Sequence, residues 1–175
     1  MSWADAATLV ALGSAAVDAV LIALLARPDQ PDAASGTRFG LPLGAGLPPF
    51  TGTAVDMTRV TDADARGRLL LFVGNACHSC HPLVADLATL DARERSGLLI
   101  IVVDRAPAAG ADLADALTFM PRSQVMLDPV REIADRMAMP GVPFLYAIDL
   151  SGRVRAKSAI SSAVLVRSLS KYSNL

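Results

Sequence analysis

The segment Asn75-Ala76-Cys77-His78-Ser79-Cys80-His81-Pro82 contains both cysteines of the 175-residue chain. It directly follows a continuous apolar run at residues 68–74, which is typical of a strand covered by helices on both faces. Residues 82–94 come next, and their apolar positions recur at helical spacing. The two cysteines therefore stand between a buried strand and the start of a helix.

This position of the cysteines favours redox chemistry. The free backbone N–H groups and the dipole at a helix N-terminus stabilise a thiolate, which is the nucleophilic form of cysteine. Two thiols on the first turn, three residues apart, can also close a disulfide with little movement of the backbone. We expect the outer thiolate to attack the disulfide of a partner and the inner thiol to resolve the mixed disulfide. His78, inside the motif, is expected to favour the Cys77 thiolate further.

The motif permits three other interpretations. Cys77-x-x-Cys80-His81 matches the haem-attachment motif C-x-x-C-H, with His81 as an axial ligand, but none of the six methionines stands out as the second ligand. A metal site would draw all four ligands, Cys77, His78, Cys80 and His81, from five residues, which strains tetrahedral geometry. A purely structural disulfide around so short a loop would remove little chain entropy. A redox-active pair is favoured, and a haem-binding or metal-binding electron-transfer protein is the alternative.

A second candidate part of the site is the segment Met139-Pro140-Gly141-Val142-Pro143-Phe144, which lies between an expected helix and an expected strand. An X-Pro bond that opens a buried strand can be cis. A cis bond before Pro143, beside the cysteines, would leave the Val142 backbone N–H and C=O free to pair with the main chain of a substrate. We therefore predict that Val142 and Pro143 belong to the substrate-binding surface.

The remaining pattern predicts the fold class. Further strands are expected at residues 98–103, 144–148 and 154–160, the last two joined by a turn at Ser151-Gly152. Further helices are expected at residues 111–120, 130–137 and 161–171. Strands that alternate with helices and end in a hairpin and a helix predict a mixed β-sheet in an α/β sandwich.

The N-terminus has a different composition from the rest. The chain is 53% hydrophobic, and the surplus is concentrated in residues 6–26, which include a single charged residue, Asp18. A helix of this length spans about 30 Å, the thickness of the hydrocarbon core of a bilayer. We predict a membrane anchor helix at residues 1–27, a flexible linker rich in proline and glycine at residues 28–46, and a folded domain at residues 47–175. A cleaved signal peptide is disfavoured because no basic residue precedes the apolar stretch.

The net charge and the positions of single charged residues indicate which partners and which compartment to expect. A net charge of −1 is too neutral for a protein that binds nucleic acid by neutralising phosphates. Small and polar residues share one helical stripe of the apolar segment with Asp18, which predicts a face that contacts a membrane redox partner. The single basic residue after this segment, Arg27, would by itself place the domain in the cytoplasm.

Several motifs, in this order, resemble the thioredoxin-like domains of the TlpA type. They are Leu47-Pro48-Pro49-Phe50, the apolar run that leads into Cys77-x-x-Cys80, Leu127-Asp128 before a helix, and Gly141-Val142-Pro143-Phe144 leading to Ile148-Asp149-x-Ser151-Gly152. The apolar N-terminus followed by a spacer is further similar to the membrane-anchored accessory thioredoxins of methylamine utilisation, the MauD type.

The resemblance implies a thioredoxin-like three-layer sandwich that needs no cofactor. It implies Cys77 as the nucleophile, Cys80 as the resolving cysteine and Pro143 as a cis-proline that shapes the substrate groove. It also implies an extracytoplasmic domain, anchored in the cell membrane, that oxidises, reduces or isomerises the disulfides of a dedicated client protein. For the orientation in the membrane we follow this resemblance, because a single arginine, Arg27, is weak evidence for a cytoplasmic domain.

The sequence departs from its relatives at three places. Ala76 stands where many relatives have a tryptophan. The strand before the motif lacks the acidic residue of classical thioredoxins, so the Cys80 proton must go to water or to another base such as His81. Gly74 replaces the threonine of peroxiredoxins, which disfavours peroxidase activity.

Overall fold

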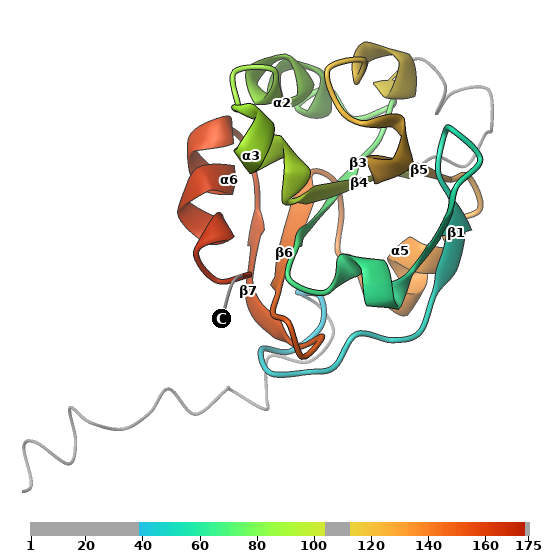
Figure 1. The fold of residues 1–175 in the computed structure, drawn as a ribbon, viewed down its shortest axis with the longest axis vertical. Helices are drawn as coiled ribbons and strands as arrows, with labels where there is room; N and C mark the ends of the chain where they lie inside the picture. Colours follow the sequence, from blue (N-terminus) through green and yellow to red (C-terminus); the bar gives the residue numbers. More distant parts are fainter. Residues whose placement is uncertain (1–38, 104–112, 174–175) are drawn as a thin grey trace, which may run out of the picture. The chain divides into compact units, whose positions relative to one another are not determined.

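A five-stranded mixed sheet forms the centre of the domain (Figure 1). The structure is a computed structural model and describes residues 39–103 and 113–173. The strand order is β5-β4-β3-β6-β7. The strands are β3 (Leu69–Val73), β4 (Leu98–Val103), β5 (Val125–Asp128), β6 (Phe144–Ile148) and β7 (Val154–Ala159). The first three are parallel, whereas β6 and β7 each run antiparallel to the preceding neighbour in this order. The predicted mixed α/β sheet is confirmed.

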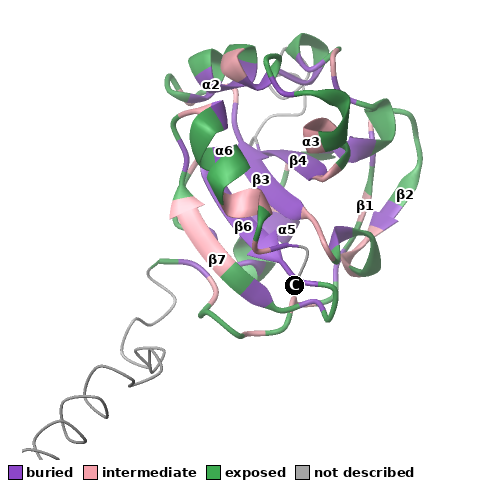
Figure 2. Cartoon of the chain, turned by 60° about the vertical axis from the view of Figure 1, so that its left-hand side comes forward, coloured by how far each residue is buried: buried purple, intermediate pink, exposed green. Residues whose placement is uncertain are grey.

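The central strands are buried on both faces, as their continuous apolar sequences predict. Every residue of β3, β4 and β6 is buried (Figure 2). Along β3, Leu69 and Leu71 belong to one hydrophobic core, and Leu70 and Phe72 belong to the other. This alternation follows from the two-residue period of a strand. The sheet therefore separates two apolar cores and needs a covering layer on each side.

Helices supply most of that cover. The first core contains residues of α2 (Cys80–Leu87) and α6 (Ala163–Ser170), together with Leu113 and Leu117 around a helical stretch at residues 113–116. The second core contains residues of α5 (Glu132–Arg136) and Val60 of β2. The remaining elements are β1 (Thr51–Thr53), β2 (Arg59–Thr61), η1 (Asp62–Ala65), α3 (Ala92–Ser96) and η2 (Arg122–Gln124). The arrangement is the three-layer sandwich that the resemblance implies.

The prediction of a single helix at residues 82–94 is wrong. The structure has two helices there, α2 and α3, because Asp91 starts a new one. The Asp91 carboxylate accepts a hydrogen bond from the Glu94 N–H (2.8 Å), and the Glu94 carboxylate accepts one from the Asp91 N–H (2.8 Å). This reciprocal capping box fixes a helix N-terminus at a position that apolar periodicity reads as helix interior.

The sequence also did not predict three short strands. The strands β1, β2 and β5 have three, three and four residues, too few to show a periodic pattern. β1 pairs with β2, and the residues that follow β1 join β5 through a bond from the Val55 N–H to the Val125 carbonyl (2.8 Å). The small hairpin thus continues the structure beyond the β5 edge of the main sheet.

The predicted anchor at residues 1–27 lies outside the described residues, as does the linker up to residue 38. No helix in the described ranges is long and apolar enough to cross a membrane. Residues 39–46 pack on the domain. The Gly44 N–H donates to the Val154 carbonyl (2.7 Å), and the Leu41 N–H donates to the Tyr146 hydroxyl (3.2 Å).

Candidate active site

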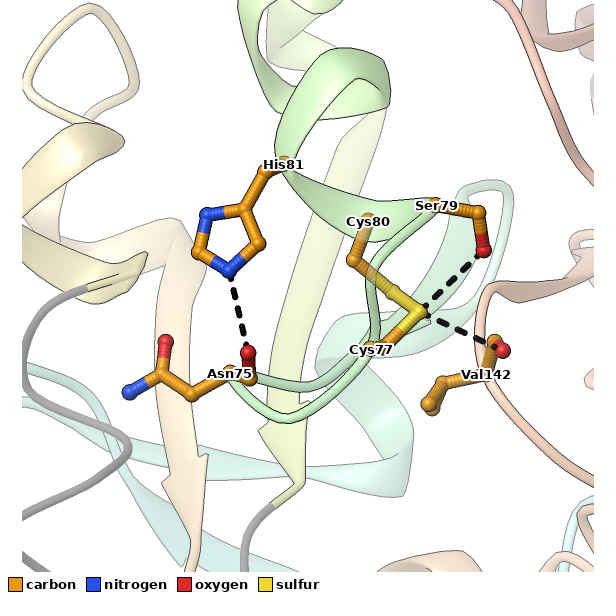
Figure 3. The surroundings of a disulfide bond; sticks show 6 residues. All are labelled: Asn75, Cys77, Ser79, Cys80, His81 and Val142. Atoms are coloured by element: carbon orange, nitrogen blue, oxygen red, sulfur yellow. Dashed lines mark hydrogen bonds between the residues drawn. A yellow bond between two sulfur atoms is a disulfide. The ribbon is translucent and has the colours of Figure 1, made fainter.

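Cys77 and Cys80 form a disulfide in the loop that follows the carboxyl end of β3 (Figure 3). The loop is closed by hydrogen bonds from the Cys77 N–H to the Gly74 carbonyl (3.1 Å) and from the Cys80 N–H to the Cys77 carbonyl (2.9 Å). α2 begins at Cys80. The expectation that both cysteines lie on the first helical turn is therefore wrong, because α2 begins at Cys80 and a turn at residues 78–79 separates Cys77 from it. Cys77 is half-buried and Cys80 is fully buried.

Two polar groups lie against the Cys77 sulfur (Figure 3). The Ser79 hydroxyl oxygen is 3.3 Å from it, and because a disulfide sulfur carries no proton, the hydroxyl is the donor. The Val142 carbonyl oxygen is 3.4 Å from the same sulfur and can accept a hydrogen bond only from the reduced thiol. Ser79 was not singled out by the sequence, although its place inside the motif was a signal.

The Val142–Pro143 peptide bond is cis, as predicted. Residues 139–144 lie beside the cysteines, since the Val142 carbonyl reaches the Cys77 sulfur. Of the two Val142 backbone groups that were expected to be free for a substrate, only the N–H is free of partners among the described residues. The Val142 carbonyl faces the sulfur, whereas no described residue accepts a hydrogen bond from the Val142 N–H.

Unlike Ser79, the two histidines of the motif have no described hydrogen bond to the Cys77 sulfur. The His78 side chain is exposed, and no described hydrogen bond joins it to the sulfurs. His81 donates from Nε2 to the Asn75 carbonyl (3.0 Å), so its ring is turned toward Asn75 and not toward the disulfide (Figure 3). Asn75 in turn accepts a hydrogen bond from the Leu113 N–H at its side-chain oxygen (2.9 Å). His81 thus helps to hold the loop, and its Nε2 is not directed at Cys80.

The described residues include two buried carboxylates, Asp128 and Asp149, and neither has a described hydrogen bond to a cysteine. Asp128 accepts a hydrogen bond from the Ala134 N–H (2.9 Å). Asp149 accepts hydrogen bonds from the Ser151 hydroxyl (2.7 Å), the Arg153 N–H (2.8 Å) and the Arg155 guanidinium (2.6 Å). The departure from classical thioredoxins that the β3 sequence indicated therefore holds in three dimensions.

A groove of about 720 Å³ opens next to the disulfide. One end is formed by Ser79 and by the loop that contains Val142 and Pro143. The other wall comes from the end of β7, including Lys157, and from the exposed ring of Phe39. Lys157 and Phe39 were missed, because nothing in the local sequence places them near residues 77–80.

The described residues contain no group of three or more His, Cys, Asp or Glu side chains that could hold a metal ion. The four ligands of the metal alternative do not converge. The two sulfurs bond to each other, and His81 bonds to a backbone carbonyl.

No protein-family model matches the sequence, and neither does any curated protein. Solved structures do match. The thioredoxin domain of a thiol-disulfide oxidoreductase from Bacteroides vulgatus is 22% identical, with a TM-score of 0.60, over 77% of this chain and 99% of that one. A thio-disulfide isomerase from Thermus thermophilus is 24% identical, with a TM-score of 0.58, over 77% and 100% of the two chains.

A third similar structure is a secreted disulfide oxidoreductase of Mycobacterium tuberculosis. It is 18% identical, with a TM-score of 0.55, over 70% of this chain and 95% of that one. At these identities the similarity establishes the fold. The described part of this chain has the thioredoxin-like fold, with a Cys-x-x-Cys disulfide at the end of its central strand.

Proposed function

We propose that this protein is a thiol-disulfide oxidoreductase whose redox centre is the Cys77–Cys80 pair. The observation that carries the proposal is the asymmetry of the disulfide. Cys77 is partly exposed beside an open groove, and Cys80 is buried behind it. A client sulfur can approach the outer cysteine but not the inner one, which matches the division into attacking and resolving cysteines.

The reaction transfers two electrons between two dithiol/disulfide couples. In the reducing direction, the Cys77 thiolate attacks a client disulfide, forms a mixed disulfide and releases one client thiolate. The Cys80 thiolate then attacks the Cys77 sulfur, closes the Cys77–Cys80 disulfide and releases the second client thiolate, and the two protons lost by the protein balance those gained by the client. The reverse sequence oxidises a client dithiol.

Three groups assist this chemistry in the proposal. The Ser79 hydroxyl, 3.3 Å from the Cys77 sulfur, donates to the thiolate as charge develops there. The Val142 N–H, next to Pro143, is available to pair with the client main chain. His78, exposed beside Cys77, favours the thiolate without a described hydrogen bond to the sulfur.

The client, tether and compartment are parts of the same proposal. The apolar segment at residues 6–26 and the TlpA-type motifs support an anchor helix in the cell membrane and a domain outside the cytoplasm, and one of the similar proteins is secreted. The Asp18 face of that helix would contact a membrane redox partner that restores the oxidation state of the pair.

A trapping experiment tests the proposed function. A Cys80→Ser variant can form the mixed disulfide but cannot resolve it, so we expect it to accumulate a covalent complex with its client on non-reducing gels. Cys77→Ser is the matched control and should accumulate far less. Equal and low trapping by the two variants would contradict the assignment of Cys77 as the nucleophile.

A further inference from the structure

Among the residues that the structure describes, Lys157 is the only charged one that lines the groove. It lies on β7, opposite Tyr146 of β6, and its ammonium donates to the Gly40 carbonyl (3.3 Å). No described carboxylate lies within ion-pair distance of it. An ammonium has three donors, and Gly40 occupies one of them. The groove therefore contains one positive charge without a described counter-ion.

The surroundings of Lys157 are only partly hydrated. Its side chain is half-buried, and burial lowers the pKa of its ammonium below the ordinary value. Removing a cation from water without an anionic partner is unfavourable, and an incoming carboxylate would relieve that cost. Phe39, Pro143 and Phe144 make the neighbouring walls apolar, so water screens such a pair less than it would on an open surface.

The distance from Lys157 to the redox centre suits a peptide. β7 is followed by Ile160, whose N–H donates to the Pro143 carbonyl (3.3 Å) beside the disulfide. Lys157 is three residues before Ile160, and three residues of a strand span about 10 Å. An extended client that places its cysteine at Cys77 thus brings side chains two to four residues away to Lys157.

We propose that the groove selects client segments with acidic side chains two to four residues from the reacting cysteine, and that Lys157 is the residue that determines this specificity. The proposal rests on the proposed oxidoreductase function and identifies its substrate class. Lys157 is a recognition residue, because it lies outside the reacting sulfurs.

Reduction of synthetic peptides by the full-length protein tests the proposal. Three cysteine peptides, each joined as its own disulfide dimer, carry Glu, Gln or Lys at the second to fourth positions on both sides of the cysteine. The reduced protein gives up two electrons and two protons to each dimer and releases two peptide thiols. We expect the second-order rate constant for the Glu peptide to exceed that for the Lys peptide by about three- to fivefold at low salt, and the ratio to fall as salt rises.

The chain offers a matched control, because Lys157 and Lys171 are its only lysines. Lys157→Met and Lys171→Met change the net charge equally, but Lys171 lies beyond α6 and does not line the groove. Lys157→Met should lose the preference, Lys171→Met should keep it, and Lys157→Arg should restore it. The salt dependence of the unmodified protein requires no variant and therefore does not depend on any variant folding.

The outcomes separate the two proposals. Equal reduction of all three peptides by the unmodified protein would overturn the role of Lys157 and leave the oxidoreductase function intact. A preference for acidic peptides that survives in Lys157→Met would overturn it as well. Failure of the reduced protein to reduce any of the peptide dimers, together with failure of the oxidised protein to oxidise any of the peptide thiols, would overturn both.

Discussion

At the scale of single residues, the Cys77 sulfur is set between two groups with opposite effects. The Ser79 hydroxyl donates to the sulfur and favours the thiolate, whereas the Val142 carbonyl accepts from the thiol and favours the protonated form. Both contacts are long for hydrogen bonds to oxygen but ordinary for sulfur. The reactivity of Cys77 therefore depends on which of the two groups the reduced sulfur engages.

A Ser79→Ala substitution tests the first of these contacts. Ser79 precedes α2, but its side chain does not cap the helix, so the change removes the contact to sulfur without removing a cap. We expect alkylation of reduced Cys77 by iodoacetamide at neutral pH to slow about three- to tenfold, because a hydrogen bond to the thiolate is lost. The pH at which alkylation is half-maximal should rise.

His78→Ala, measured in the same way, compares a side chain that has no described hydrogen bond to the sulfur with Ser79, which has one. Because the His78 side chain is exposed and not bonded to the sulfur, its loss should slow alkylation less than the loss of the Ser79 hydroxyl. A larger effect of His78→Ala would reverse the assignment.

At the scale of elements, α2 and α6 are coupled by one side chain. Asp86 of α2 accepts a hydrogen bond from the Ala163 N–H at the start of α6 (2.6 Å). Ser162, the residue before α6, makes no side-chain cap of its own. A carboxylate from a neighbouring helix thus fulfils the role that a local N-cap residue normally has, and it does so where the helix dipole favours negative charge.

Removal of this carboxylate should loosen α6. We expect Asp86→Ala to lower the free energy of unfolding by about 1–2 kcal/mol, the usual value of an N-cap, in urea titrations of the oxidised protein. Asp115→Ala, at an exposed aspartate with no described hydrogen bond, is the matched control and should change stability little. If the two variants lose equal stability, the cross-helix cap contributes nothing specific.

A second close contact between elements, with β4, explains why residue 74 is a glycine. Gly74 directly follows β3, and a Cβ atom at this position would lie 2.8 Å from the Val103 carbonyl oxygen of β4. The absence of the peroxiredoxin threonine is therefore a packing requirement as well as a chemical difference. Only the approach of β4 reveals this reason.

At the scale of the whole molecule, acid stability depends on a buried aspartate that is far along the chain from the Cys77–Cys80 disulfide. The Ser151 hydroxyl, the Arg153 N–H and the Arg155 guanidinium hold the pKa of the Asp149 carboxyl at about 2, and burial opposes them only in part. A lowered pKa means that the native state prefers the carboxylate. The stabilisation is complete above the unfolded pKa near 4 and is lost as the pH falls toward 2.

Asp149→Asn should remove this pH dependence. Between pH 4 and pH 2 we expect the unmodified protein to lose about 2 kcal/mol more unfolding free energy than the variant, as measured by urea titration at each pH. Asp115→Asn serves as the control for the general effect of removing an acid. Parallel stability curves for Asp149→Asn and the unmodified protein would contradict the assignment.

Much of the domain could be predicted because its signals are local. The apolar runs of β3, β4 and β6 indicate buried strands wherever they occur, and a proline between a helix and a strand indicates the turn before Phe144. The short strands β1, β2 and β5 could not be predicted, because their pairing and not their own pattern makes them strands. The break between α2 and α3 needed the reciprocal bonds of Asp91 and Glu94.

For the candidate site, the sequence by itself predicted the proposed redox chemistry, because both cysteines follow a buried strand at a spacing that allows a disulfide between them. Tertiary structure alone revealed that Lys157 lines the same groove, whereas Val142 was predicted from its place before Pro143. Val142 and Lys157 are 65 and 80 positions from Cys77, and only the pairing of β3 with β6 and of β6 with β7 brings their segments to one groove. Reactivity is a property of residue type and local backbone, whereas recognition depends on side chains that the fold gathers from distant parts of the chain.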